Sequence, residues 1–297
     1  MNIDKLKSLF YQTLSSLFFS ILGMQVKLLS QKINIEVIVF YRCLIGLFLI
    51  IIFFAFQYKK KKFNYLKTPN IFLQIIRSIF GIFAMYFGYS ALSFIPLAQA
   101  STIGFTKVFF VSILAIIFFS EKLTKEVLFF SILGFVGTYL ILNPDELISS
   151  NGTILSLISS FFVAAGIISS VKLLNSNKTI TIIFYHSFFS TILSGIIFFS
   201  EISYLNLYDL FQLTLLTITA LIGQFLNMES YKYEKTSVVI LFSYSRVIFS
   251  FLLGYFFLQE NIESINIIGI LIIIVSTYLV SKIRNSQKSI IMDKGNG

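Results

Sequence analysis

The chain alternates long apolar runs with short breaks that contain charged or turn-forming residues, such as the basic loop from Tyr58 to Lys67. An apolar run of about 20 residues is long enough, as an α-helix, to cross a hydrocarbon layer of about 30 Å. The pattern therefore predicts an all-α membrane protein with ten transmembrane helices. We expect these helices at residues 8–27, 36–57, 70–92, 97–119, 126–143, 152–172, 179–199, 209–231, 236–258 and 264–281.

The amino-acid composition agrees with a membrane environment. Hydrophobic residues make up 57% of the 297 residues and charged residues only 12%, whereas a soluble domain is about a quarter charged. The net charge of +10 does not indicate nucleic-acid binding, because the basic residues lie in short loops between apolar runs rather than on one face. The single cysteine, Cys43, excludes an internal disulfide.

The distribution of basic residues predicts the orientation in the membrane. Cytoplasmic loops retain Lys and Arg, and a cytoplasmic N-terminus places 17 of the 23 basic residues on the cytoplasmic side and only Lys27 and Lys32 outside. The remaining four lie within spans. We therefore expect a multi-pass protein of the bacterial cytoplasmic (inner) membrane with both termini in the cytoplasm.

The two halves of the chain resemble each other. A constant offset of 139 residues aligns Lys107 with Arg246, Glu121 with Glu260 and the Thr-Tyr-Leu at 138–140 with that at 277–279. Each half holds five spans, and an odd number inverts the second copy relative to the first. The predicted organisation is a first repeat at 8–143, a second inverted repeat at 152–282 and a cytoplasmic tail at 283–297.

Several segments resemble a known family. The stretch from Tyr89 to Ala100 (YSALSFIPLAQA), the stretch from Phe118 to Thr124 (FFSEKLT) and the second-copy stretch from Phe257 to Glu260 (FLQE) are similar to the EamA-type branch of the drug/metabolite transporter superfamily. The resemblance implies a ten-helix secondary carrier that moves a small organic metabolite across the membrane by alternating access.

A finer resemblance concerns the substrate. The Arg77-Ser78 start of the third span and the spacing from Arg246 to Glu260 look similar to carriers that take up riboflavin or S-adenosylmethionine. Export of amino acids or other metabolites is the alternative left open, and the sequence also leaves a homodimer open. The expected partners are a small-molecule substrate and the lipid bilayer, with no nucleic acid, cofactor or metal.

Charged residues within spans are the first candidates for function. Each costs about 2.5 to 3.5 kcal/mol on insertion scales and usually faces a cavity, a partner or a substrate. Lys107 and Arg246 lie near the middle of the fourth and ninth spans at equivalent repeat positions. We expect both to bind an anionic or electron-rich group at one central site. The alternative is that each pairs with a carboxylate or lines a wet crevice without a role in binding. Arg77, near the start of the third span, is a further substrate-binding candidate, and a gate pair with Glu229 or contact of the two residues with lipid headgroups are the alternatives.

Polar residues of the third, fourth, eighth and ninth spans are expected to form the cavity wall, although Ser and Thr also serve helix–helix hydrogen bonding. Arg42 and His186 occupy matching places in the second and seventh spans, and His186 and Glu229 are the candidates for gating or coupling. The substrate-binding candidates in the wall are Tyr86, Tyr89, Thr106, Gln224, Asn227, Ser243 and Tyr244.

A membrane-embedded enzyme is the alternative of another class. The sequence contains no HExxH, GxSxG or P-loop motif and only one histidine, so the parts of a metal hydrolase or of a nucleophile with a histidine base are missing. A channel is disfavoured because neither rings of carboxylates nor a filter loop is visible.

Overall fold

The computed structural model describes residues 3–58, 67–121, 125–142, 150–259 and 264–282. Within these ranges the chain consists of α-helices and one short 3₁₀-helix, without a strand. The predicted tail at 283–297 and Glu260 lie outside the described residues. The helices are α1 (Ile3–Leu29), α2 (Ile35–Tyr58), α3 (Ile71–Phe94), α4 (Leu97–Gly104), α5 (Lys107–Phe119), α6 (Lys125–Leu142), α7 (Ser150–Leu174), α8 (Thr179–Ile197), α9 (Leu207–Ser230), α10 (Thr236–Phe242), α11 (Ser245–Leu258) and α12 (Ser264–Lys282), with η1 (Phe199–Glu201) between α8 and α9.

Among the described residues, eight helical segments are long and apolar enough to cross a membrane. Six of them are single helices, and two are continuous spans made of a pair, α4 with α5 and α10 with α11. Two shorter apolar stretches, Leu128–Gly137 and Ile267–Leu279, lie within α6 and α12. The helical form follows from the solvent, because a helix satisfies its own backbone polar groups where lipid offers no hydrogen bond.

The two paired spans are interrupted in the same way, at Phe105 and at Tyr244. Around each of these residues the backbone hydrogen bonds reach three rather than four residues back, as from Phe105 N to Thr102 O at 3.0 Å and from Tyr244 N to Leu241 O at 3.2 Å. Such 3₁₀ turns within a helix often mark functional positions. The two interruptions are 139 residues apart, which is the offset of the sequence repeat.

The ends of these spans match as well. Ser120 and Gln259, also 139 residues apart, close α5 and α11 in the left-handed region, with φ of 53° and 57°. Few residues other than glycine adopt this conformation. Next to Ser120, Glu121 accepts backbone hydrogen bonds from Thr236 N at 3.0 Å and Ser237 N at 3.2 Å. The carboxylate thereby ties the first half of the chain to the first turn of α10.

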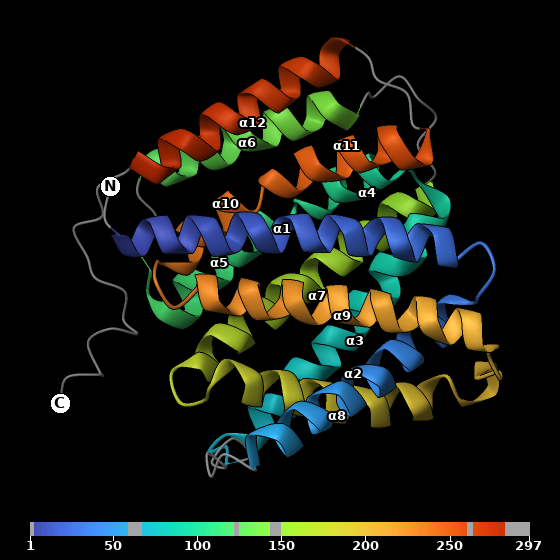
Figure 1. Ribbon diagram of the computed structural model, residues 1–297. Helices are drawn as coiled ribbons and strands as arrows, with labels where there is room; N and C mark the ends of the chain where they lie inside the picture. Colours follow the sequence, from blue (N-terminus) through green and yellow to red (C-terminus); the bar gives the residue numbers. More distant parts are fainter. Residues whose placement is uncertain (1–2, 59–66, 122–124, 143–149, 260–263, 283–297) are drawn as a thin grey trace.

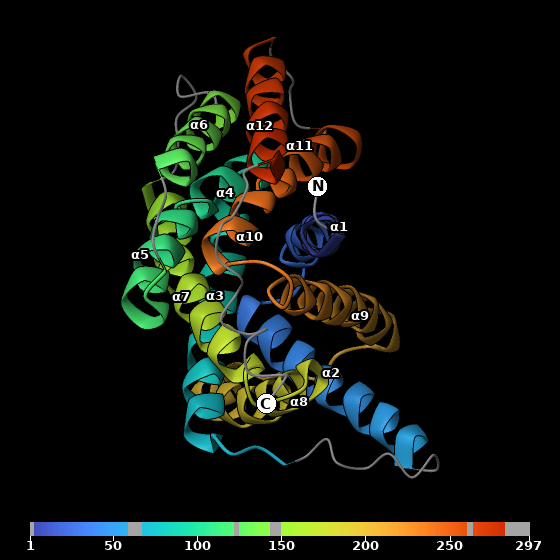
Figure 2. The ribbon, with the colours of Figure 1, turned by 90° about the vertical axis from the view of Figure 1, so that its left-hand side faces the viewer.

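The helices form one bundle, with α6 and α12 side by side at one edge and α2 and α8 together at the opposite edge (Figures 1 and 2). Between these edges, α1 packs on α9 and α3 packs on α7. The start of α1 and the end of α12 lie at the same end of the bundle (Figure 1).

Small residues and serines hold these helices close together. Ser15 Oγ donates to Gly223 O at 2.8 Å between α1 and α9, and Ser159 Oγ donates to Ala84 O at 2.8 Å between α7 and α3. A Cβ on Gly137 of α6 would lie 2.9 Å from a backbone oxygen of α12. Close approach and hydrogen bonds of this kind replace the hydrophobic driving force that lipid does not provide.

Candidate functional site

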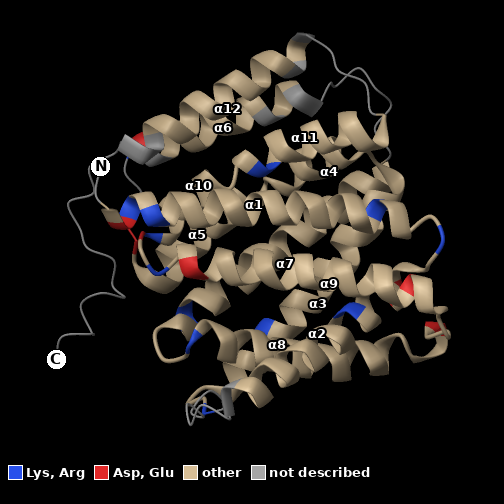
Figure 3. Cartoon of the chain, viewed as in Figure 1, with Lys and Arg blue, Asp and Glu red and all other residues tan. Residues whose placement is uncertain are grey.

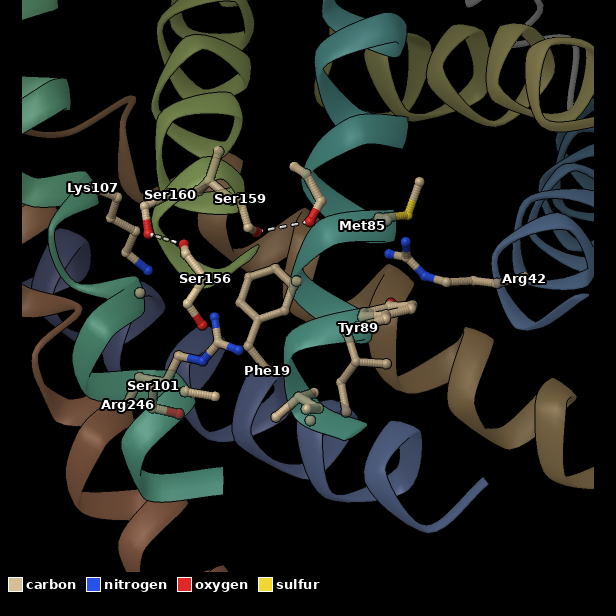
Figure 4. Close-up of a pocket in the computed structure, with 18 residues that line it drawn as sticks. Phe19, Arg42, Met85, Tyr89, Ser101, Lys107, Ser156, Ser159, Ser160 and Arg246 are labelled. Atoms are coloured by element: carbon tan, nitrogen blue, oxygen red, sulfur yellow. Dashed lines mark hydrogen bonds between the residues drawn. The ribbon is translucent and has the colours of Figure 1, made fainter. Parts of the chain in front are cut away.

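A cavity of about 180 Å³ lies among α1, α2, α3, α4, α5, α7 and α11 (Figure 4). Its lining residues come from the C-terminal halves of α1 and α3 and mainly from the N-terminal halves of α2 and α7. The cavity is therefore displaced towards one end of the bundle, opposite to the end where α1 begins.

Lys107 and Arg246 both line this cavity. They stand in the first turns of α5 and α11, directly after the two helix interruptions. The Lys107 Nζ lies 4.6 Å from the centre of the Phe105 ring, and the Arg246 guanidinium carbon lies 5.7 Å from the centre of the Phe19 ring. The start of a half-helix carries partial positive charge, so side chains and backbone both favour an anion at this place.

The two cations have few partners of their own. Lys107 is 8% exposed, and the buried Nε of Arg246 has no hydrogen-bond partner among the described residues. No Asp or Glu is among the described residues that line the cavity. A cation held in a membrane span without a carboxylate is typical of a ligand-binding position.

Arg42 of α2 is a third cation in the wall, which sequence reasoning did not assign to the site. Its guanidinium carbon lies 5.8 Å from the centre of the Tyr89 ring, and Tyr89 itself lines the cavity as expected. Figure 4 shows Arg42 on one side of the cavity and Lys107 with Arg246 on the other. The sequence signals for Arg42 were its position within an apolar span and its match with His186 in the seventh span.

A group of serines completes the wall. Ser156, Ser159 and Ser160 come from one face of α7, and Ser101 comes from α4. Ser101 Oγ donates to Ser250 Oγ at 2.8 Å, which donates to Ser20 Oγ at 3.0 Å.

This serine chain ends on the interrupted span. The hydroxyl hydrogen of Ser20 is shared between the backbone oxygens of Arg246 and Ser16, each 3.0 Å from Oγ. The chain of hydrogen bonds thus connects α4 and α1 to the backbone at the start of α11, and fixes the position from which the Arg246 side chain extends.

Two of the predicted residues, His186 and Gln224, lie around a second, smaller cavity. A cavity of about 10 Å³ is lined by His186 and Gln224 together with Arg42, which borders both cavities. Arg77 lies outside the main cavity and donates from Nε to Ser170 Oγ at 3.0 Å. His186 Nδ1 lies 3.1 Å from Ser190 Oγ. Their proposed roles in binding and coupling stay predictions.

Four other candidates serve helix contacts in this structure. Tyr244 stacks on Phe105 with ring centres 4.9 Å apart and donates from its hydroxyl to Ser131 O at 2.9 Å. Tyr86 packs on Phe198, and Thr106 and Ser243 donate to backbone oxygens of their own helices. None of these four is among the residues that line the main cavity.

Asn227 and Glu229 lie towards the other end of the bundle. Gln12 Oε1 accepts from Asn227 Nδ2 at 3.0 Å and from Ser230 Oγ at 2.8 Å, which joins α1 to α9. Glu229 forms an ion pair with Lys232 at 2.6 Å. In the described structure Glu229 and Arg77 therefore have separate partners and do not form a gate pair.

The chain was compared with known proteins. Two segments, residues 6–143 and 150–282, match the model of the EamA-like transporter family. The chain belongs to this family. The resemblance seen in the residues of the first half is thereby confirmed, and EamA-like proteins are transporters rather than enzymes. This chain is a membrane carrier for a small metabolite.

Curated relatives in this family carry different names. The chain is 24% identical to the pseudopaline exporter CntI of Pseudomonas aeruginosa, over 95% of this chain and 99% of that protein. It is 25% identical to the S-adenosylmethionine uptake transporter of Rickettsia bellii, over 73% and 75% of the two chains. It is 27% identical to solute carrier family 35 member G1 of Mus musculus, over 91% and 76%.

The fold has a solved counterpart. A structure described only as the crystal structure of a protein superposes with a TM-score of 0.72 at 15% identity, over 94% of this chain and 98% of that one. At this level of identity the likeness concerns the fold alone.

Proposed function

We propose that this chain is a secondary carrier that binds the anionic group of a small organic metabolite between Lys107 and Arg246 and moves it across the membrane by alternating access. One observation carries the proposal: two cations at matching helix interruptions face one cavity, and no carboxylate is among its described lining residues. Uncompensated cations in a bilayer are costly, and a bound anion offsets that cost.

We further propose ten spans in two inverted repeats. The equal spacing of the two interruptions and of the two left-handed caps supports this. Helix packing supports it as well: exchanging the halves turns the contact of α1 with α9 into that of α7 with α3, and leaves α2–α8 and α6–α12 unchanged. Related halves in opposite orientations supply two conformations, one open to each side of the membrane.

The orientation follows from the charge pattern. Figure 3 shows Lys and Arg concentrated at the end of the bundle where α1 begins, with fewer at the other end and some between. We propose that the first of these ends faces the cytoplasm. The cavity then lies towards the outer side, and the contact of Gln12 with Asn227 and Ser230 closes the cytoplasmic side.

A vitamin or nucleotide-like metabolite, such as riboflavin or S-adenosylmethionine, is one proposed substrate class. S-adenosylmethionine carries a carboxylate that Lys107 and Arg246 would bind, whereas riboflavin carries no anionic group. The similarity to S-adenosylmethionine uptake transporters supports this class. Export is the second candidate direction, supported by the similarity to a pseudopaline exporter. Accumulation in inverted vesicles and in spheroplasts distinguishes export from uptake.

The binding test uses purified protein in detergent with riboflavin, S-adenosylmethionine, nucleotides, amino acids and organic acids. A ligand that binds the native state raises the Tm. We expect an anionic ligand to raise the Tm of the wild type but not of Lys107→Met or Arg246→Gln. Lys172→Met removes an exposed lysine outside the cavity and serves as the control. Equal stabilisation of all four proteins would place the site elsewhere.

A further inference from the structure

The three cations of the cavity are divided between two places. Lys107 and Arg246 extend from α5 and α11, whereas Arg42 extends from α2. Figure 4 shows the side chains of both groups directed towards the space between them, where Tyr89 and Phe19 lie. The cavity therefore has two separate positive ends rather than one positive centre.

Among the described residues, no carboxylate lines either end of the cavity. The described contacts of Arg42 and Arg246 include aromatic rings, Tyr89 and Phe19 respectively, and no ion pair with a carboxylate. A ligand with one anionic group would compensate one end and leave the other uncompensated. A ligand with an anionic group at each end would compensate both, and Arg can hold a carboxylate through two parallel hydrogen bonds.

The space between the two ends suits a short neutral connection. The apolar side chains of Phe19, Met85 and Leu92 line it together with the hydroxyls of Ser156 and Ser159. A carbon chain would contact the apolar side chains, and polar substituents on that chain would form hydrogen bonds with the serine hydroxyls.

The same surroundings disfavour a substrate with a positive charge. A cation is recognised by a carboxylate or by a free aromatic face. No Asp or Glu is present among the described lining residues, and Arg42 and Arg246 already lie over the rings of Tyr89 and Phe19. A sulfonium or ammonium group would therefore lie near three cations and no described carboxylate, which disfavours S-adenosylmethionine among the proposed substrates.

We propose that the cavity binds a metabolite with two separated anionic groups, a dicarboxylate or larger polycarboxylate, with one group on Arg42 and the other on Lys107 and Arg246. The inference rests on the proposed function and adds Arg42 as a specificity-determining residue. Arg42 distinguishes doubly from singly anionic substrates.

The test measures dissociation constants by calorimetry for the linear dicarboxylates from succinate to suberate, and for the monomethyl ester of each. The ester keeps the carbon chain of the diacid, removes one charge and adds one methyl group. We expect one chain length to bind best, and its diacid to bind the wild type at least about tenfold more tightly than its ester, which is the contribution of one charge-assisted hydrogen-bonded pair.

Arg42→Gln separates this inference from the proposed function. We expect it to abolish the preference for the diacid and to leave the affinity for the ester within about twofold, because the ester needs only Lys107 and Arg246. We expect Lys107→Met to weaken the binding of both ligands, and Lys172→Gln to leave both dissociation constants unchanged. Matched near-native melting curves show that each variant is folded.

Three results would overturn the inference. They are equal affinity of diacid and ester in the wild type, equal loss of both in Arg42→Gln, and tighter binding of S-adenosylmethionine than of any dicarboxylate. After either of the last two results, the proposed anion site at Lys107 and Arg246 still stands if Lys107→Met and Arg246→Gln weaken the binding of the ligand concerned. If no anionic probe binds the wild type at all, the proposed anion site fails as well.

Discussion

The carboxylate of Glu121 holds Ser237 by two hydrogen bonds, accepting from the backbone N at 3.2 Å and from Oγ at 2.7 Å. Together with the bond from Thr236 N, these contacts fasten the loop after α5 to the first turn of α10. The partial positive charge of that turn strengthens a contact with a carboxylate. Glu121 therefore connects one paired span to the other.

Replacing Glu121 by Gln tests this contact. The neutral amide keeps one acceptor and loses the charge, so we expect the free energy of unfolding to fall by about 1 to 3 kcal/mol. The Tm of the purified protein in detergent measures the change. Glu201→Gln, at an exposed residue of η1, is the control and is expected to leave the Tm unchanged. An unaltered Tm in the Glu121 variant would contradict the role of this contact.

The closeness of α3 and α8 depends on the absence of a side chain at Gly81. A Cβ at this position would overlap with His186 Cε1, and His186 is itself buried and hydrogen-bonded to Ser190. We expect Gly81→Ala to lower the free energy of unfolding by about 1 to 3 kcal/mol, which is typical of overpacking.

Gly166→Ala provides the matched comparison within α7. The nearest atom to its Cβ would be 4.0 Å away, and alanine is the better helix former by about 0.5 to 1 kcal/mol. We expect the Tm to rise slightly in this variant. A fall as large as that of Gly81→Ala would show that crowding is not the cause.

Hydropathy and repeat spacing predicted much of the fold, for physical reasons. Lipid imposes a length and an apolar composition on every span, so each predicted range falls on a described helix or helix pair. The interruptions at Phe105 and Tyr244 were not predicted, because neither has a proline and the change lies only in which carbonyl the backbone N–H selects. Hydropathy and turn-forming residues do not indicate where this change in backbone hydrogen bonding occurs.

The candidate site was predicted in part. Lys107 and Arg246 were identified because an uncompensated charge near the middle of a span is costly wherever it faces. Arg42 and Arg77 carry the same charge within spans, yet Arg42 lines the cavity and Arg77 contacts Ser170. Their positions along the bundle distinguish them, because Arg77 lies in the N-terminal half of α3, whereas the cavity is lined by the C-terminal half of α3 and by Arg42 in the N-terminal half of α2. This placement depends on how distant segments pack together.

Tyr244 illustrates a binding candidate whose observed contacts are structural. Its hydroxyl donates to Ser131 O and its ring stacks on Phe105. We expect Tyr244→Phe to keep the stacking, to lower the free energy of unfolding by about 1 kcal/mol through the lost hydrogen bond, and to leave the dissociation constants of dicarboxylates unchanged. A large loss of affinity with an unchanged Tm would instead support a direct contact of the hydroxyl with the substrate.

Accessibility of single cysteines tests the proposed orientation. In a Cys43→Ser background, Ser156→Cys places a thiol in the cavity, and Asn227→Cys places one in the contact with Gln12 that joins α1 and α9. With both termini in the cytoplasm, a membrane-impermeant thiol reagent added to spheroplasts should modify the first cysteine and not the second. An anionic reagent should react faster than a cationic one of equal size, because the three cations of the cavity attract it. Modification of Ser156→Cys only in inside-out vesicles would reverse the orientation, because the side of the membrane to which the cavity opens would then be the cytoplasmic one.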